Sequence, residues 1–178
     1  MNRCGTVASA CALMWALTVT GAARQAPSPN SAAEDWNEYL PPGKGRELVA
    51  KECAACHTLE GIVRLRATQP AWEAVVFDMV ARGAPLMLDE VDPIVGYLAT
   101  AFGPAVPPLI DVNTATAEEL GKLPGVTPAL AARLIEHRRL KGPFASREAV
   151  RDILGMDEAA FEKMKWFVRA ARPTPAAR

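Results

Sequence analysis

Two thiols and an imidazole lie within five consecutive residues, Cys53-Ala54-Ala55-Cys56-His57. Cysteines separated by two residues at the start of a helix lie close enough to form thioether bonds to the two vinyl groups of one haem, and C-x-x-C-H is the sequence motif of that attachment. The imidazole of His57 would then be the proximal axial ligand of the iron. The motif therefore predicts one covalent haem c, held by Cys53, Cys56 and His57.

Other uses of these three residues explain less of the pattern. A structural zinc site needs a second pair of Cys or His ligands, and the other two cysteines, Cys4 and Cys11, lie in an N-terminal apolar segment. A thioredoxin-like redox pair would follow a strand within a βαβ pattern, which is not found here. An ordinary disulfide would leave His57 without a role.

A low-spin iron needs a sixth ligand. The chain contains only two histidines, and the second, His137, lies in the other half of the sequence. A methionine thioether is therefore expected, which raises the reduction potential relative to a second imidazole. Met79 lies on the same apolar helical stripe as Trp72 and is the predicted ligand. Met87 is the alternative, and Met79 would then simply fill the core.

Residues 34–104 contain the elements that must position these groups. The pattern predicts a short helix from Gly45 to Glu52 that leads into the motif, a helix that begins at Pro70, and a last helix from Leu88 to about Phe102. This layout resembles class I c-type cytochromes, in which the closing helix crosses the N-terminal one. Together with the interval from Trp72 to Met79 and the following Gly83-Ala84, the resemblance implies a single-electron carrier with Met79 as ligand. Arg64 and Arg66 would meet haem propionates or remain solvated.

The first residues indicate the compartment. Arg3 precedes an apolar run that ends in Gly21-Ala22-Ala23, which is typical of a secretory signal peptide over residues 1–23. An uncleaved anchor is the alternative, although the run is short for a bilayer crossing of ~20 residues. Residues 24–33 and 171–178 are expected to be a disordered leader and tail. The mature chain is predicted to be exported to the periplasm of a bacterial cell envelope and to have no membrane span.

A Pro-rich linker, residues 105–108, separates this half from a second pattern over residues 109–170. This pattern resembles the helix-hairpin-helix domain of competence-type DNA receptors. The residues that carry the resemblance are Asp111-Val112-Asn113-Thr114-Ala115, Glu118-Glu119-Leu120, Leu123-Pro124-Gly125-Val126 and Gly142-Pro143-Phe144. A weaker second hairpin turns at Leu154-Gly155-Met156-Asp157. The fold class expected for the whole chain is all-α.

The second pattern predicts contacts to the DNA backbone. Amides of Gly125, Val126 and Thr127, at the positive end of a helix, suit a phosphate oxygen and read no base, and Gly155 would do the same in the second hairpin. Basic side chains would neutralise phosphates along the same strand. These are Arg133, Arg138, Arg139 and Lys141.

Charge gives mixed support to a DNA partner. The chain holds 20 basic and 20 acidic residues, so no global field favours nucleic acid. Residues 109–172 hold eleven basic and nine acidic residues, whereas residues 34–104 hold six and eleven. The main prediction is an exported monohaem electron carrier, with a redox partner protein and a helix-hairpin-helix module for docking or DNA. The alternative is an envelope protein that binds double-stranded DNA without sequence specificity and has a structural or sensory haem. An enzyme is not expected, because no catalytic triad or carboxylate pair can be argued.

Overall fold

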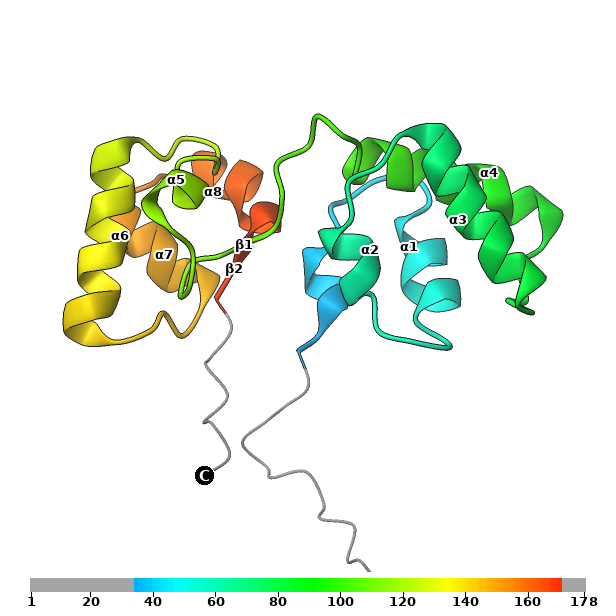
Figure 1. The fold of residues 1–178 in the computed structure, drawn as a ribbon, viewed down its shortest axis with the longest axis horizontal. Coiled ribbons are helices and arrows are strands. Elements are labelled where there is room, and N and C mark those ends of the chain that lie inside the picture. The colour runs from blue at the N-terminus through cyan, green and yellow to red at the C-terminus, as the bar shows by residue number, and fades with distance from the viewer. Residues whose placement is uncertain (1–33, 171–178) are drawn as a thin grey trace, which may run out of the picture. The chain divides into compact units, whose positions relative to one another are not determined.

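The structure is a computed structural model that describes residues 34–170, and these residues belong to one compact unit (Figure 1). Helices dominate, so the all-α prediction is confirmed. The predicted signal peptide, leader and tail lie outside the described residues. No helix within residues 34–170 combines the length and the apolar character that a membrane crossing requires. Two separate hydrophobic cores are present, one formed by residues between 36 and 102 and one by residues between 110 and 168.

The first core is enclosed by short helices and two longer ones. In chain order these are the 3-10 turn η1 (Trp36–Tyr39), α1 (Arg46–Leu48), the π-helical turn η2 (Val49–Cys53), α2 (Glu60–Arg64), α3 (Gln69–Ala81) and α4 (Leu88–Ala101). The helix expected from Gly45 to Glu52 is therefore present in another form, since its second half widens into η2, which ends at Cys53. Such π turns often occur at functional sites. Pro70 opens α3 as expected.

Close backbone contact joins the beginning and the end of this half. Gly45 has a left-handed backbone, with φ +98°, and a Cβ placed there would lie 2.3 Å from the carbonyl oxygen of Pro93 in α4. Behind this contact, Tyr97 donates a hydrogen bond to the Pro41 carbonyl oxygen at 2.7 Å. The buried Trp72 of α3 donates to the Phe102 carbonyl oxygen at 3.1 Å. These contacts close α1 and α3 onto α4.

The second core is enclosed by four helices and a two-stranded sheet. Its elements are β1 (Ile110–Asp111), α5 (Ala117–Leu120), α6 (Pro128–Lys141), α7 (Arg147–Leu154), α8 (Glu158–Met164), the 3-10 turn η3 (Lys165–Phe167) and β2 (Val168–Arg169). The strands pair in parallel, Ile110 with Val168 and Asp111 with Arg169. The predicted helices are present, and the strands are an addition that the sequence pattern did not predict.

Capping groups fix where the helices of the second core begin. Thr116 and Glu119 form a capping box, because the Glu119 amide donates to Thr116 Oγ1 at 3.2 Å and the Thr116 amide donates to Glu119 Oε2 at 2.7 Å. Thr127 caps α6, whose first residue is Pro128. Ser146 and Asp157 cap α7 and α8. Side-chain oxygens thus satisfy amides that the helices themselves leave unpaired.

The predicted linker is hydrogen-bonded to the first half. Arg66 donates to the carbonyl oxygen of Val106 at 3.3 Å and to that of Pro107 at 2.6 Å, while its guanidinium lies 5.4 Å from the Phe102 ring centroid. Arg169 pairs with Glu34 at 2.7 Å, and Arg147 pairs with Glu38 at 3.1 Å. Segments far apart in the sequence are therefore joined by hydrogen bonds from arginines.

Candidate functional site

A cavity of about 490 Å³ in the first half collects the predicted haem ligands. Cys53, Cys56, His57 and Met79 all line it. Its walls are otherwise mostly apolar and come from η2, α2, α3, α4 and the loop between the last two helices. The remaining lining residues are Glu52, Gly61, Ile62, Leu65, Trp72, Val75, Val76, Arg82, Gly83, Ala84, Leu86, Ile94 and Leu98. A volume in the ~300–1,000 Å³ range and apolar walls with a few placed polar groups are usual for cofactor sites.

The imidazole of His57 contacts the backbone of the next residue. Its Nδ1 lies 2.8 Å from the carbonyl oxygen of Thr58. A carbonyl oxygen only accepts hydrogen bonds, so this contact is a hydrogen bond in the tautomer that carries its proton on Nδ1. A metal-bound histidine is oriented in the same way by a bond from its second nitrogen. In that tautomer, Nε2 would be the nitrogen that binds iron.

The two cysteines differ in their surroundings. Cys56 is exposed and Cys53 is half-buried, and neither forms a disulfide. Burial raises the pKa of the Cys53 thiol to about 11, and the nearby Glu52 carboxylate adds to the increase. Both thiols line the same cavity as His57. Within residues 34–170, no group of three His, Cys, Asp or Glu residues could hold a bare metal ion.

The two methionine candidates are placed very differently. Met79 is half-buried on α3 and lines the cavity, four residues beyond Val75 and seven beyond Trp72 on the same lining. Met87 precedes α4, is 66% exposed and does not line the cavity. The cavity thus has one thioether at its wall, and that thioether belongs to Met79.

Arg64 and Arg66, which the sequence places either at haem propionates or in solvent, have partners within the chain. Arg64 pairs with Glu60 at 2.9 Å and lies over the Trp36 ring, and Arg66 holds the linker. Neither lines the cavity. Arg82, which the sequence reasoning missed, does line it and pairs with Asp78 at 2.8 Å. Its position three residues after Met79 was the available signal, since i and i+3 share a helix face.

The residues present fit a covalent haem c. Two thiols, one imidazole with a free Nε2 and one thioether line a single apolar cavity, and an arginine at its edge could meet a propionate. Four of the lining residues are fully or almost fully buried, namely Trp72, Val76, Ile94 and Leu98. They would exclude water from the porphyrin.

The first hairpin of the second half presents unpaired amides. Gly125 has φ +79°, a left-handed backbone that favours glycine, and the Val126 amide closes the turn by donating to the Leu123 carbonyl oxygen at 3.1 Å. The amides of Gly125 and Thr127 have no hydrogen-bond acceptor within residues 34–170. Both residues are exposed at the N-terminus of α6, whose dipole favours an anion.

In the second hairpin, the equivalent amides already donate hydrogen bonds within the chain. The amide of Gly155 donates to the Asp152 carbonyl oxygen at 3.3 Å, and that of Met156 donates to the Arg151 carbonyl oxygen at 3.3 Å. The carboxylate of Asp157 caps α8 and accepts from the Ala160 amide at 2.7 Å. A phosphate would meet this carboxylate, so the amide of Gly155 is not offered to DNA as the sequence interpretation expected.

Comparison with known proteins identifies this second half. Residues 108–169 match the family described as Helix-hairpin-helix motif. These residues form a helix-hairpin-helix domain. The chain is also 40% identical over 57 residues to ComE operon protein 1 of Bacillus subtilis (strain 168), which covers 32% of this chain and 28% of that protein. This similarity supports the competence-type resemblance.

Two further relatives are similar to part of the chain. Endonuclease/exonuclease/phosphatase family domain-containing protein 1 of Bos taurus is 33% identical over 79 residues, 44% of this chain and 14% of the relative. The protein of that name in Homo sapiens is 39% identical over 57 residues, 32% of this chain and 10% of the relative. The chain thus spans less than a third of the length of these curated relatives. No solved structure matches the chain.

The basic side chains of α6 differ in whether they have a partner within the chain. Arg138 donates from its two terminal nitrogens to the carbonyl oxygens of Val112, at 2.8 Å, and Ala115, at 2.7 Å. Its guanidinium is therefore held within the domain. Arg139 pairs with Glu136 at 2.7 Å. Arg133 and Lys141 are exposed and form no ion pair within residues 34–170.

Proposed function

We propose that this chain is an exported protein that contacts the DNA backbone through its helix-hairpin-helix domain and carries one covalent haem c in its first half. The observation that carries the haem proposal is the single cavity lined by Cys53, Cys56, His57 and Met79. The matched family and the free amides of the first hairpin support the DNA proposal. The export proposal rests on the signal-peptide pattern of residues 1–23.

DNA contact is assigned to the first hairpin. The amides of Gly125 and Thr127 would donate to one phosphate oxygen, and the helix dipole of α6 would add to the attraction. Arg133 and Lys141 follow on the same helix and would neutralise neighbouring phosphates. Because these groups contact the backbone alone, binding would be independent of sequence.

Haem attachment is assigned to the first cavity. Cys53 and Cys56 would form the thioether bonds, and His57 Nε2 and the Met79 thioether would bind the iron. When bound, the haem would supply reversible one-electron chemistry. The chain's own part is to fix the ligands, to orient the imidazole through the contact of Nδ1 with the Thr58 carbonyl oxygen, and to exclude water with Trp72 and the aliphatic wall.

Two measurements on one preparation test these proposals. The protein is expressed with its signal segment and a haem-ligation system, and mass spectrometry should show one covalent tetrapyrrole. A colourless product with two reactive thiols would rule out the haem. Fluorescence polarisation with a labelled duplex at low salt should show micromolar or tighter binding that weakens steeply as salt rises. Binding that does not depend on salt, or none at low salt, would rule out the DNA contact.

Single-electron transfer is the second candidate function. It is favoured by the pairing of an imidazole with a thioether at one cavity, a ligand set that raises the reduction potential relative to two imidazoles. A redox titration of the haem-loaded protein, with and without duplex DNA, separates the two roles. A reversible one-electron wave that DNA leaves unchanged supports a carrier. A haem that cannot be reduced reversibly would leave only a structural role.

A further inference from the structure

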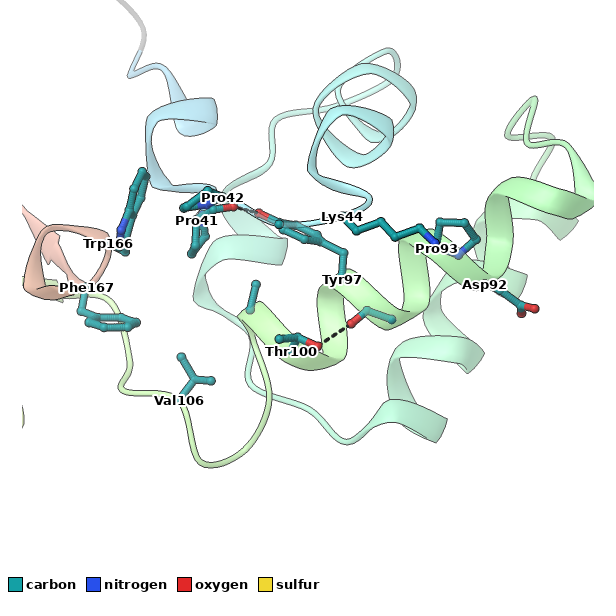
Figure 2. Close-up of a pocket in the computed structure, with 13 residues that line it drawn as sticks. Pro41, Pro42, Lys44, Asp92, Pro93, Tyr97, Thr100, Val106, Trp166 and Phe167 are labelled. Atoms are coloured by element: carbon teal, nitrogen blue, oxygen red, sulfur yellow. Dashed lines mark hydrogen bonds between the residues drawn. The ribbon is translucent and has the colours of Figure 1, made fainter. Parts of the chain in front are cut away.

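A second cavity, of about 730 Å³, lies on another face of α4 (Figure 2). It is open to solvent and is formed by the Pro41–Lys44 turn, by α4, by Val106 of the linker and by Trp166 and Phe167 of η3. Ile94 and Leu98 of α4 line the first cavity, whereas Pro93 and Tyr97 line the second. The two cavities therefore share α4 as a wall, and none of the predicted haem ligands lines the second one.

The lining of the second cavity is dominated by flat, rigid groups. Three aromatic rings belong to Tyr97, Trp166 and Phe167, and the pyrrolidine rings of Pro41 and Pro42 lie beside them (Figure 2). Aromatic groups favour stacked or edge-on contact with other rings, and they lose little conformational entropy when a ligand binds. A flat conjugated molecule gains most from such walls.

The middle of the cavity offers few unsatisfied polar groups. The Tyr97 hydroxyl already donates to the Pro41 carbonyl oxygen at 2.7 Å, and the Thr100 hydroxyl donates to the Gly96 carbonyl oxygen at 2.8 Å (Figure 2). Both donors are thus used within the chain. A ligand in this position would exchange water for apolar and aromatic surface without leaving a buried donor unpaired.

The end of the cavity away from Trp166 and Phe167 carries charge. Lys44 reaches along Pro93 there, and it forms no ion pair within residues 34–170 (Figure 2). The acid of the lining, Asp92, extends beyond Pro93 and away from Tyr97 (Figure 2). An ammonium with three donors suits a carboxylate or sulfonate at one end of a ligand.

We propose that this cavity is a binding site for a flat aromatic molecule that bears an anionic group. Its rings would lie between Tyr97 and the Trp166–Phe167 pair, and its anionic group would face Lys44. The site goes beyond the proposed haem and DNA functions, since neither function uses these side chains.

Gly96 provides a direct way to block the cavity. It lines the cavity from α4, and a Cβ built there has no atom within 4 Å, so Gly96→Leu would place a bulky side chain at the cavity with no obstacle at its Cβ. Leucine is also a better helix former than glycine. The matched control is Gly121→Leu, because Gly121 is exposed, has an ordinary helical backbone and lies in the other core's domain.

The probe is anthraquinone-2-sulfonate, and calorimetry measures its binding to the haem-loaded protein. One molecule should bind, Gly96→Leu should weaken binding at least about tenfold, a loss of ~1.4 kcal/mol, and Gly121→Leu should leave it unchanged. Equal binding by the Gly96→Leu protein, or no binding to the wild-type protein, would overturn the proposal.

A second variant tests the anionic end. Lys44→Ala should weaken the sulfonate several-fold and leave neutral hydroxymethyl-anthraquinone unaffected, because only the sulfonate uses the ammonium. Equal effects on both probes would contradict the assignment of Lys44. A near-native circular dichroism spectrum for each variant shows that a lost affinity does not reflect unfolding.

Discussion

Gly45 lies against Pro93 so closely that any side chain at residue 45 would enter the Pro93 carbonyl oxygen, with a Cβ 2.3 Å away. This contact joins the turn before α1 to the middle of α4. Gly45 has the left-handed φ that glycine adopts at least cost.

Replacing Gly45 with alanine should therefore destabilise the protein by about 2 kcal/mol or more, because the left-handed backbone and the clash both oppose a side chain. Urea unfolding measures the change. Gly96→Ala on the same helix is the comparison, and it should stabilise the protein by about 0.5–1 kcal/mol because nothing opposes its Cβ. Equal effects of the two substitutions would show that the close approach does not exist.

Replacing Met79 should change the visible spectrum of the oxidised haem protein. Met79→Ala should abolish the methionine-to-iron absorption band near the red end of the spectrum, because the thioether at the cavity wall is removed. Met87→Ala is the matched control and should keep the band, since Met87 is exposed outside the cavity. Loss of the band in the Met87 variant, with retention in the Met79 variant, would reverse the ligand assignment.

The basic residues of α6 should differ in role, some contributing to DNA binding and one to the stability of the fold. Arg133→Ala and Lys141→Ala should each lower the slope of log affinity against log salt by about 0.9 per lost phosphate contact. Lys163→Ala, an exposed lysine on α8, should leave the slope unchanged. Polarisation titrations at several salt concentrations measure these slopes.

Arg138→Ala should act instead on stability. It removes two hydrogen bonds from a charged group to the Val112 and Ala115 carbonyl oxygens, which costs at least about 2 kcal/mol. Thermal unfolding measures this loss. A variant with native stability and weakened DNA binding would show that Arg138 contacts phosphate after all.

The ion pair between Glu34 and Arg169 should make stability depend on pH. Burial works to raise the pKa of Glu34, but hydrogen bonds from Arg169 and Tyr39 outweigh it, so that the pKa is lowered in the folded protein. A lowered pKa stabilises the fold above the unfolded-state pKa, and this contribution is lost as pH falls through the folded-state pKa. Glu34→Gln should thus lower Tm at pH 7 and lower it less at pH 3. An equal loss at both pH values would exclude the charge as the cause.

Local structure, such as where a helix begins, could be predicted from the sequence where one or two residues determine it. Thr116 followed three residues later by Glu119 indicates a capping box, and Pro128 indicates the start of a helix. Both features are present in the structure. The strands β1 and β2 were not predictable, because each has two residues and Ile110 finds its partner, Val168, at the far end of the domain. No periodic pattern can develop over two residues.

Side-chain roles that depend on distant backbone were also beyond the sequence. Arg138 and Arg133 look alike as basic residues of one helix, yet only Arg138 meets carbonyl oxygens of the segment before α5. Arg66 likewise resembles a propionate ligand in the sequence, but in the structure it donates hydrogen bonds to the carbonyl oxygens of Val106 and Pro107. The second cavity depends on Trp166 and Phe167, which are far in sequence from Tyr97.

Because α4 forms a wall of both cavities, a turn of this helix about its own axis would move both linings together. Three rings also run between them, with Trp72 and Phe102 at 6.5 Å and Phe102 and Tyr97 at 6.2 Å. A ligand that bound one rotational setting of α4 more tightly than another would change the affinity of the other cavity, and linkage would make the reverse effect equally large.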